Sequence, residues 1–467
     1  MHPDTGSRLL NSLLASALLS LSVTAATAGA AQYQLPAGAA AYDDPYIAAG
    51  FRALFTCSAH FAMHRPLDDI IAVELADTRA LELPEPVIDQ ARRLVRADDG
   101  QGNTVVAAFR DTMGCTVLPP DWPESKLASL PYVARDLPAH DPDQPFPLGD
   151  GNDQLPDQRL TALLDAAFSG DNYGDGTLTA GIIVVKGGQI IAERYRSGFG
   201  VHQGYRTWST AKSISASLIG IAVGQGLLQL DAPAPIPEWQ SPGDPRRAIQ
   251  LDHLLWMSSG LWSEGSNTYA MYFGGQDVIS SATTTHLEAA PGSRWKYANN
   301  DTLLALRALR HVLDDDLRYL RYPYDELLHK IGMYNTWMEI DHDGNFIGSS
   351  QVYTTARDLA RFGLLYLNDG IWNGERILPE GWAAFVSQPA PSLPSEKGKR
   401  GYGAQFWLFD RLPGIPVGTY TSTGNKGQFA TIVPTQDLVV IRTGVDPLGR
   451  RWQQPAFVAD VIATLEN

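Results

Sequence analysis

WSTAKSISASLI, residues 208–219, is the stretch that decides the fold of this 467-residue chain. Its small and apolar residues recur at helical spacing, which predicts a buried helix. If Ser209 opens that helix, Lys212 lies one turn later on the same face, within reach of the serine hydroxyl. A serine becomes nucleophilic when a neighbouring base takes its proton, and a desolvated lysine can be that base. The stretch therefore predicts a nucleophilic serine at a helix N-terminus, where the helix dipole favours an oxyanion.

The Ser-x-x-Lys pattern is weak evidence alone, because Ser293 and Lys296 repeat it in the same chain. These two residues belong to a second segment, PGSRWKYANN, residues 291–300. Its Tyr297 offers a phenol that can shuttle protons, and Asn299 offers an amide that can hold a substrate carbonyl or the lysine. A tyrosine packed under a surface turn is the ordinary alternative for this segment.

A third segment, YTSTGNKGQ, residues 420–428, directly precedes the last predicted hairpin. Glycine lets a sheet edge approach a ligand closely, so Thr423 and Gly424 are candidate substrate contacts. The backbone amide of Asn425 is a candidate second oxyanion donor. Taken alone, the segment is typical of an ordinary turn.

Together the three segments occur in the order and with the separations seen in serine β-lactamases and penicillin-binding proteins. The chain resembles the class C β-lactamase-like serine hydrolases, and within them the branch of 6-aminohexanoate-dimer hydrolase and related esterases. Framework segments at residues 254–261 and 353–379 strengthen the resemblance, which extends from residue 155 to residue 465. It implies an α+β fold, with an antiparallel sheet flanked by helices, a helical subdomain, and the active site in the groove between them.

The resemblance also implies roles for the site residues. Ser209 would be the acylated nucleophile, Lys212 its base and Tyr297 a proton relay. Asn299 would contact the substrate or the lysine, and the backbone amides of Ser209 and Asn425 would form the oxyanion hole. Neither a metal nor an organic cofactor is needed for this reaction.

One departure from the family pattern bears on the substrate. β-Lactamases usually carry Lys or His before the Thr-Gly pair, and here the position is Ser422. The missing cation would hold a drug carboxylate, so a small carboxylic ester or linear amide is the expected substrate, although Lys426 could swing back and restore the contact. A β-lactamase or D-amino-acid peptidase of the same fold, or a catalytically silent binding module, remains the alternative.

Other catalytic readings are less favoured. The sequence has no G-x-S-x-G, which a Ser-His-Asp hydrolase would normally show. Two histidines near the motifs, His202 and His253, are expected to be surface or packing residues. Three tryptophans either line an apolar pocket or belong to the core: Trp208, Trp256 and Trp295. Three further aromatic residues are expected in a loop over the groove: Tyr269, Tyr272 and Phe273.

Strand patterns frame these motifs. Residues 180–185 and 190–195 flank a glycine turn, which predicts a hairpin, and residues 429–433 and 438–442 predict a second one. The final residues, 455–465, have helical spacing. Strands at both ends with helices between them predict one sheet closed by the two ends of this region.

The N-terminus has the order of a secretory signal. Arg8 precedes an apolar run over residues 9–23, and small-residue cleavage patterns follow it. We expect residues 1–28 to be removed and the protein to be exported, periplasmic or secreted. An uncleaved membrane anchor is the alternative, but the polar residues in the run argue against it.

Residues 29–135 form a predicted extension that also resembles one found in some members of the branch. It holds the chain's two cysteines, Cys57 and Cys115, and in an oxidising compartment these are expected to form a disulfide. A Pro-rich connector at residues 136–157 then leads to the hydrolase domain, residues 158–467.

Composition limits the partners. Asp and Glu total 51 against 36 Lys and Arg, a formal charge of −15, so the surface repels phosphates and nucleic acid is not expected. After the N-terminal run no comparable apolar stretch occurs, so no stable membrane insertion is expected after processing. A small-molecule ester or amide remains the expected partner, and the oligomeric state stays open.

Overall fold

The computed structural model describes most of the chain beyond the predicted signal segment, residues 1–28, which lies outside the described residues. The described residues are 43–76, 78–134, 136–152, 156–263, 265–393, 396–409, 411–447 and 449–466.

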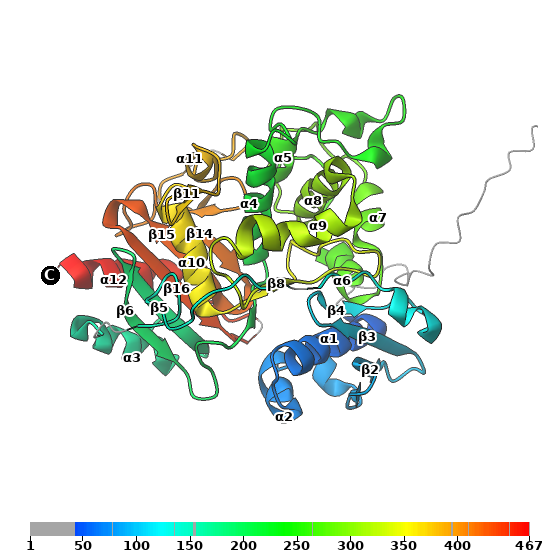
Figure 1. Ribbon diagram of the computed structural model, residues 1–467, viewed down its shortest axis with the longest axis horizontal. Helices are drawn as coiled ribbons and strands as arrows, with labels where there is room; N and C mark the ends of the chain where they lie inside the picture. The colour runs from blue at the N-terminus through cyan, green and yellow to red at the C-terminus, as the bar shows by residue number, and fades with distance from the viewer. Residues whose placement is uncertain are drawn as a thin grey trace, which may run out of the picture.

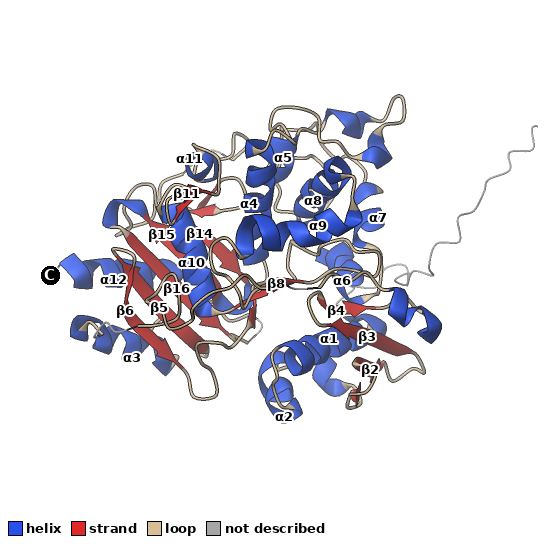
Figure 2. Ribbon diagram, in the orientation of Figure 1, coloured by secondary structure: helices blue, strands red, loops and turns tan. Residues whose placement is uncertain are grey.

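The main sheet has seven antiparallel strands in the order β12-β13-β14-β15-β16-β5-β6 (Figures 1 and 2). Both predicted hairpins are present, and β16 pairs antiparallel with β5, so the two ends of this region close one sheet as predicted. The strands are β5 (Thr179–Lys186), β6 (Gln189–Tyr195), β12 (Gly401–Tyr402), β13 (Trp407–Leu408), β14 (Tyr420–Gly424), β15 (Gln428–Val433) and β16 (Leu438–Gly444).

The central strands are apolar on both faces because helices cover both faces. Successive side chains of a strand point to opposite faces. Ile183 and Val185 of β5 join the core under α10 (Ala356–Leu367), whereas Ile182 and Val184 join a second core with α3 (Thr161–Ser169) and α12 (Gln454–Glu466). The last of these helices confirms the predicted C-terminal one.

A helical part lies beside the sheet (Figure 2). Helix α4 (Thr210–Gly224) packs between β14 and α8, which explains why Thr210 through Ala222 are all buried. The other elements here are α5 (Leu251–Leu255), α6 (Gly265–Phe273), α7 (Val278–Thr283), α8 (Asn299–Leu313), α9 (Asp316–Pro323) and α11 (Trp382–Val386), with the short strands β7 (Tyr205–Arg206), β8 (Trp337–Met338), β9 (Val352–Thr354), β10 (Ile371–Trp372) and β11 (Glu375–Arg376).

The N-terminal region pairs a helix with a four-stranded antiparallel sheet. Helix α1 (Pro45–Cys57) packs across β2 and β3, and the predicted disulfide joins Cys57 to Cys115 on β4. The other elements are α2 (Leu67–Asp69), β1 (Val87–Asp89), β2 (Leu94–Asp98), β3 (Thr104–Arg110) and β4 (Gly114–Val117). One apolar core runs from α1 into the helical part, so the domain boundaries given above stay a prediction.

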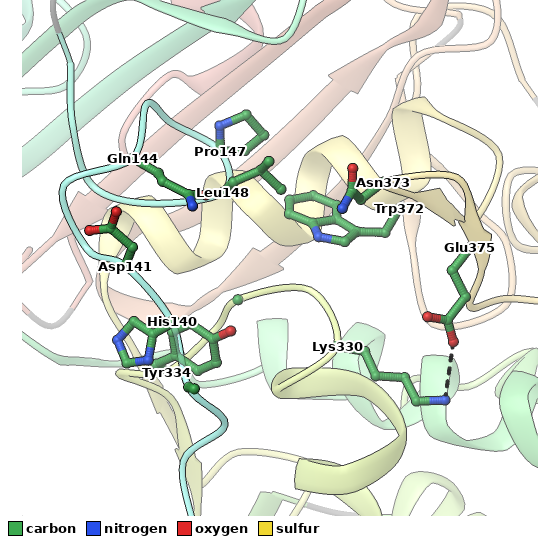
Figure 3. A pocket seen from close by; sticks show the side chains of 12 residues that line it. His140, Asp141, Gln144, Pro147, Leu148, Lys330, Tyr334, Trp372, Asn373 and Glu375 are labelled. Atoms are coloured by element: carbon green, nitrogen blue, oxygen red, sulfur yellow. Dashed lines mark ion pairs between the residues drawn. The ribbon is translucent and has the colours of Figure 1, made fainter.

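The Pro-rich connector is anchored on α10. Arg361 donates hydrogen bonds to the backbone carbonyls of Pro147 and Gly149. Between the connector and the body lies a cavity of about 520 Å³, lined by Lys330 and Trp372 among others and sharing no residue with the predicted catalytic set (Figure 3). Among the helices of the described ranges, none has the length and apolar character needed to cross a membrane.

Candidate active site

Ser209 stands at the N-cap of α4, as the sequence predicts. The segment before it is fixed by Thr207, whose amide and hydroxyl both donate to the carbonyl of Val352 on β9, each at 2.8 Å. Trp208 adopts a left-handed φ of 50°, a conformation that bulky residues rarely take outside functional sites. The turn presents the Ser209 hydroxyl, partly exposed, at the positive end of the helix dipole.

Lys212 is only 1% exposed and lies one turn into the same helix. Its Nζ is 3.3 Å from Ser209 Oγ, 2.5 Å from Asn299 Oδ1 and 2.7 Å from the carbonyl oxygen of Ser349. Burial lowers the pKa of Lys212 to about 7. A neutral amine has two N–H groups and one lone pair. In the protonated state Nζ also donates to Ser209 Oγ; in the neutral state, with its N–H groups on the two carbonyl oxygens, its lone pair would be left for the hydroxyl proton of Ser209.

Tyr297 completes the group from the loop before α8. The Ser209 hydroxyl acts on the pKa of its phenol, and its ring centroid lies 5.1 Å from Lys212 Nζ. Burial raises the pKa of Tyr297 to about 12, so the side chain remains a phenol at neutral pH. A phenol between a hydroxyl and an amine can accept one proton while giving another.

The loop that carries Tyr297 is fixed by Met257. The Lys296 amide donates to the Met257 carbonyl at 2.9 Å, and the Ala298 amide lies 3.4 Å from Met257 Sδ. Asn299 opens α8, and its Nδ2 donates to Thr268 Oγ1 at 3.0 Å, which turns its Oδ1 toward the lysine. Of the two partners predicted for Asn299, the structure places it on the lysine.

The Thr-Gly pair ends β14 beside the turn that carries Ser209. A Cβ at Gly424 would lie 2.0 Å from the Thr207 carbonyl oxygen, so a glycine is required for this close approach. Within the described residues, the hydroxyls of Ser422 and Thr423 have no hydrogen-bond partner. Asn425, the expected second oxyanion donor, is exposed and opens a short turn.

A model of the family described as Beta-lactamase matches residues 164–443. The chain belongs to the beta-lactamase family. It is 24% identical over 338 residues to the 6-aminohexanoate-dimer hydrolase of Paenarthrobacter ureafaciens, covering 66% of this chain and 84% of that protein.

Solved structures of related hydrolases share the fold of this chain. A putative 6-aminohexanoate-dimer hydrolase from Bacillus anthracis superposes with a TM-score of 0.55 at 21% identity, covering 70% of this chain and 88% of that one. A family VIII carboxylesterase gives a TM-score of 0.54 at 14% identity, with 67% and 98% covered. The α+β fold and the resemblance to this hydrolase branch are thereby confirmed.

Lys426, the residue that could restore a contact with a substrate carboxylate, is hydrogen-bonded elsewhere in this beta-lactamase-family chain. Its Nζ donates at 3.1 Å to the backbone carbonyl of Glu74 in the N-terminal region. A swing toward a substrate carboxylate would have to break this hydrogen bond.

The two histidines near the motifs occupy a surface position and a helix-cap position. His202 is exposed, and His253 accepts a hydrogen bond from the Gln250 amide at 3.2 Å as part of the cap of α5. Trp208 packs with its ring centroid 5.6 Å from that of Phe55.

The remaining tryptophans divide between two surroundings. Trp256 packs on Phe385, with ring centroids 5.4 Å apart. Trp295 joins Tyr297, Tyr402 and Trp407 in one aromatic cluster. The second group includes Tyr297.

The prediction of a loop for Tyr269, Tyr272 and Phe273 was wrong. All three lie on helix α6, where Tyr272 and Phe273 are buried. Phe273 packs against Phe51 of α1, so burial against a segment distant in the sequence overrides the loop-like polar start of this stretch.

Two residues of the site were not predicted. Ser349 contributes a backbone carbonyl, which any residue type could supply, and Thr268 contributes a hydroxyl from a segment with no motif. Within the part of the chain that the structure describes, no group of three or more His, Cys, Asp or Glu side chains is placed to hold a metal ion.

Proposed function

We propose that the protein hydrolyses small carboxylic esters or linear amides through an acyl-enzyme on Ser209. The observation that carries the proposal is the 3.3 Å contact between Ser209 Oγ and the Nζ of a buried lysine whose pKa is lowered to about 7. Such a lysine is substantially neutral at physiological pH and is therefore able to act as a general base.

The reaction follows from the positions of these groups. Ser209 Oγ attacks the substrate carbonyl carbon, and its proton passes to Lys212, directly or through Tyr297. Two amide N–H groups, of Ser209 and Asn425, stabilise the oxyanion at the dipole end of α4. Collapse of the intermediate expels the alcohol or amine, which takes the proton back, and water then hydrolyses the acyl-enzyme by the same path.

Two features favour an ester or linear amide over a β-lactam. The position before Thr423 is an uncharged, buried serine, and Lys426 is engaged by Glu74. Beside Tyr297, the rings of Trp407 and Trp295 offer apolar surface for an acyl or leaving group.

Covalent labelling tests the nucleophile. Intact-mass spectrometry after treatment with a fluorophosphonate should show one adduct in the wild-type protein and in Ser293→Ala, and none in Ser209→Ala. An adduct that persists in Ser209→Ala would place the nucleophile elsewhere, and an unlabelled but folded wild-type protein would favour a silent binding module.

A substrate panel tests the class. Short p-nitrophenyl esters and a linear aminohexanoate dimer should give higher kcat/KM than a chromogenic cephalosporin. If the cephalosporin were the best substrate, the argument from Ser422 would fail and the protein would be a β-lactamase.

Export is part of the same proposal. It is supported by the signal-like order of residues 1–28 and by the disulfide between Cys57 and Cys115, which persists in oxidising compartments. N-terminal sequencing of protein from the culture medium or periplasm should begin close to residue 29.

A further inference from the structure

Helix α1 approaches α6 more closely than side chains would allow. A Cβ at Gly50 would lie 1.8 Å from the carbonyl oxygen of Phe273, the last residue of α6. Gly50 is buried in the middle of α1, a position where glycine weakens a helix by roughly 1 kcal/mol relative to alanine. The glycine therefore serves the contact between the helices and not the stability of α1 itself. Figure 1 shows α6 directly beside α1.

Aromatic packing extends this contact on both sides of the glycine. The Phe51 ring centroid lies 5.0 Å from that of Phe273, and Phe55 reaches Trp208, the residue before the nucleophile, at 5.6 Å. Phe51 and Phe55 themselves stack at 4.1 Å. The N-terminal region thus touches both α6 and the turn that presents Ser209.

Helix α6 in turn supports the two oxygens that hold Lys212. Thr268 Oγ1 accepts from Asn299 Nδ2, and the Oδ1 of that same amide accepts from Lys212 Nζ. Tyr272 is hydrogen-bonded through its hydroxyl to Ser349 Oγ, and the carbonyl of Ser349 also accepts from Lys212 Nζ. Each of the two residues whose carbonyl oxygens accept from the lysine is therefore hydrogen-bonded to a side chain of α6.

We propose that α1 is a positioning element for the general base: its contact with α6 at Gly50 sets Thr268 and Tyr272, and these set the two acceptors of Lys212. The inference rests on the proposed function, because it gives α1 a role only if Lys212 is the base. None of the α1 residues touches the reacting atoms, so they position and do not catalyse.

The physical consequence concerns the access of water to Lys212 Nζ. Burial is the cause that lowers the pKa of Lys212 to about 7. If α6 moves away, Asn299 and Ser349 lose their supports and water can reach Nζ. The pKa of Lys212 then rises toward its ordinary value, and less of the neutral base is present at pH 7.

The test is the pH profile of kcat/KM in Gly50→Ala, measured on a short ester and normalised to fluorophosphonate-reactive sites. Normalisation removes the effect of any unfolded fraction. We expect the ascending limb to move to higher pH by roughly half to one unit, with KM changed less than about twofold. Thr268→Val, which removes the hydroxyl, should move the ascending limb in the same direction. Thr268→Ser, which keeps the hydroxyl, should have the ascending limb of the wild-type enzyme.

Gly363→Ala is the matched control. Gly363 is also a buried glycine inside a helix, and its added Cβ would lie 2.5 Å from Val439 Cγ1, in the core between α10 and the sheet. This variant overpacks a different part of the core, against a side chain and not a backbone carbonyl, and it should leave the limb in place. If it shifts the limb equally, overpacking anywhere has this effect and the proposal is wrong.

The remaining outcomes are also decisive. A labelled, folded Gly50→Ala enzyme with the wild-type limb overturns the positioning role alone. If Gly50→Ala does not fold, Phe51→Leu decides by the same criterion. Failure of wild-type Ser209 to react with the probe overturns the proposed function, and this inference with it.

Discussion

The chain contains two Ser-x-x-Lys segments, and the structure treats them in opposite ways. Ser209 and Lys212 lie on one face of α4, with the lysine 1% exposed and its Nζ between three oxygens. Ser293 and Lys296 lie in a loop. There the serine donates to the carbonyl of Ala290, and the lysine, 32% exposed, pairs with Glu288 at 3.5 Å.

The difference shows which conditions the Ser-x-x-Lys motif does not guarantee by itself. Spacing of three brings two side chains together only when the backbone is helical. A lysine becomes a base only when burial removes water from it without supplying an anion in return. Lys212 meets both conditions, whereas Lys296 meets neither, because it is in a loop and has a carboxylate partner.

Replacing the two serines should separate the segments most strongly. Ser209→Ala removes the atom that forms the acyl bond, so kcat should fall by about 10⁴-fold or more, whereas Ser293→Ala should stay within about twofold. Initial rates on a p-nitrophenyl ester measure both. Equal losses in the two variants would contradict the assignment.

The lysines provide the next test. Lys212→Arg keeps the positive charge but removes any base near neutral pH, so activity should drop by about 100-fold or more. Lys296→Arg should retain its activity within about twofold. Retention of most activity in Lys212→Arg would mean that Lys212 acts only through its charge.

How far the sequence predicts this site depends on how local each signal is. The helix that Ser209 opens and the hairpin of β15 and β16 follow from short patterns of apolar residues, and both are present. The structure brings Tyr297 and Asn299 to Lys212. Their separation in the sequence does not predict this contact, whereas the order of the three motifs along the chain does.

The support behind the lysine could not be predicted in this way. A backbone carbonyl, as at Ser349, leaves no trace in residue type. The sequence predicts a loop where α6 lies, because the burial of α6 against Phe51 depends on α1, more than 200 residues earlier in the chain. The sequence does not distinguish Gly50 from other glycines, because its role depends on the contact with Phe273.

Tyr297→Phe tests the proton path with a smaller expected effect. Burial raises the pKa of its phenol to about 12, so it stays protonated at neutral pH, which fits the proposed proton relay and not the primary base. We expect a loss of roughly 10- to 100-fold in kcat with unchanged thermal stability. Unchanged kcat would show that Lys212 exchanges protons with Ser209 directly.

The pH dependence of the wild-type enzyme is the next test. The active form has neutral Lys212, whose pKa is lowered to about 7 by burial, so kcat/KM should rise with pH and level off above that value. Well below pH 7 the loss approaches about tenfold per unit, because protonation removes the base. Lys296→Gln should leave this profile unchanged, whereas a shifted limb would implicate the second segment.

The smallest effect is expected for the stability of the exposed segment. Lys296 pairs with Glu288 at 3.5 Å, and Arg294 binds the same carboxylate at 2.9 Å, so Lys296→Ala leaves that carboxylate with a cationic partner. Ion pairs this exposed contribute little, and the Lys296 amide that joins Met257 is retained in the variant. The melting temperature should therefore change by less than about 2 °C, measured by circular dichroism. A larger fall, accompanied by loss of activity, would mean that the second Ser-x-x-Lys segment holds the Tyr297 loop through its side chain as well as its backbone.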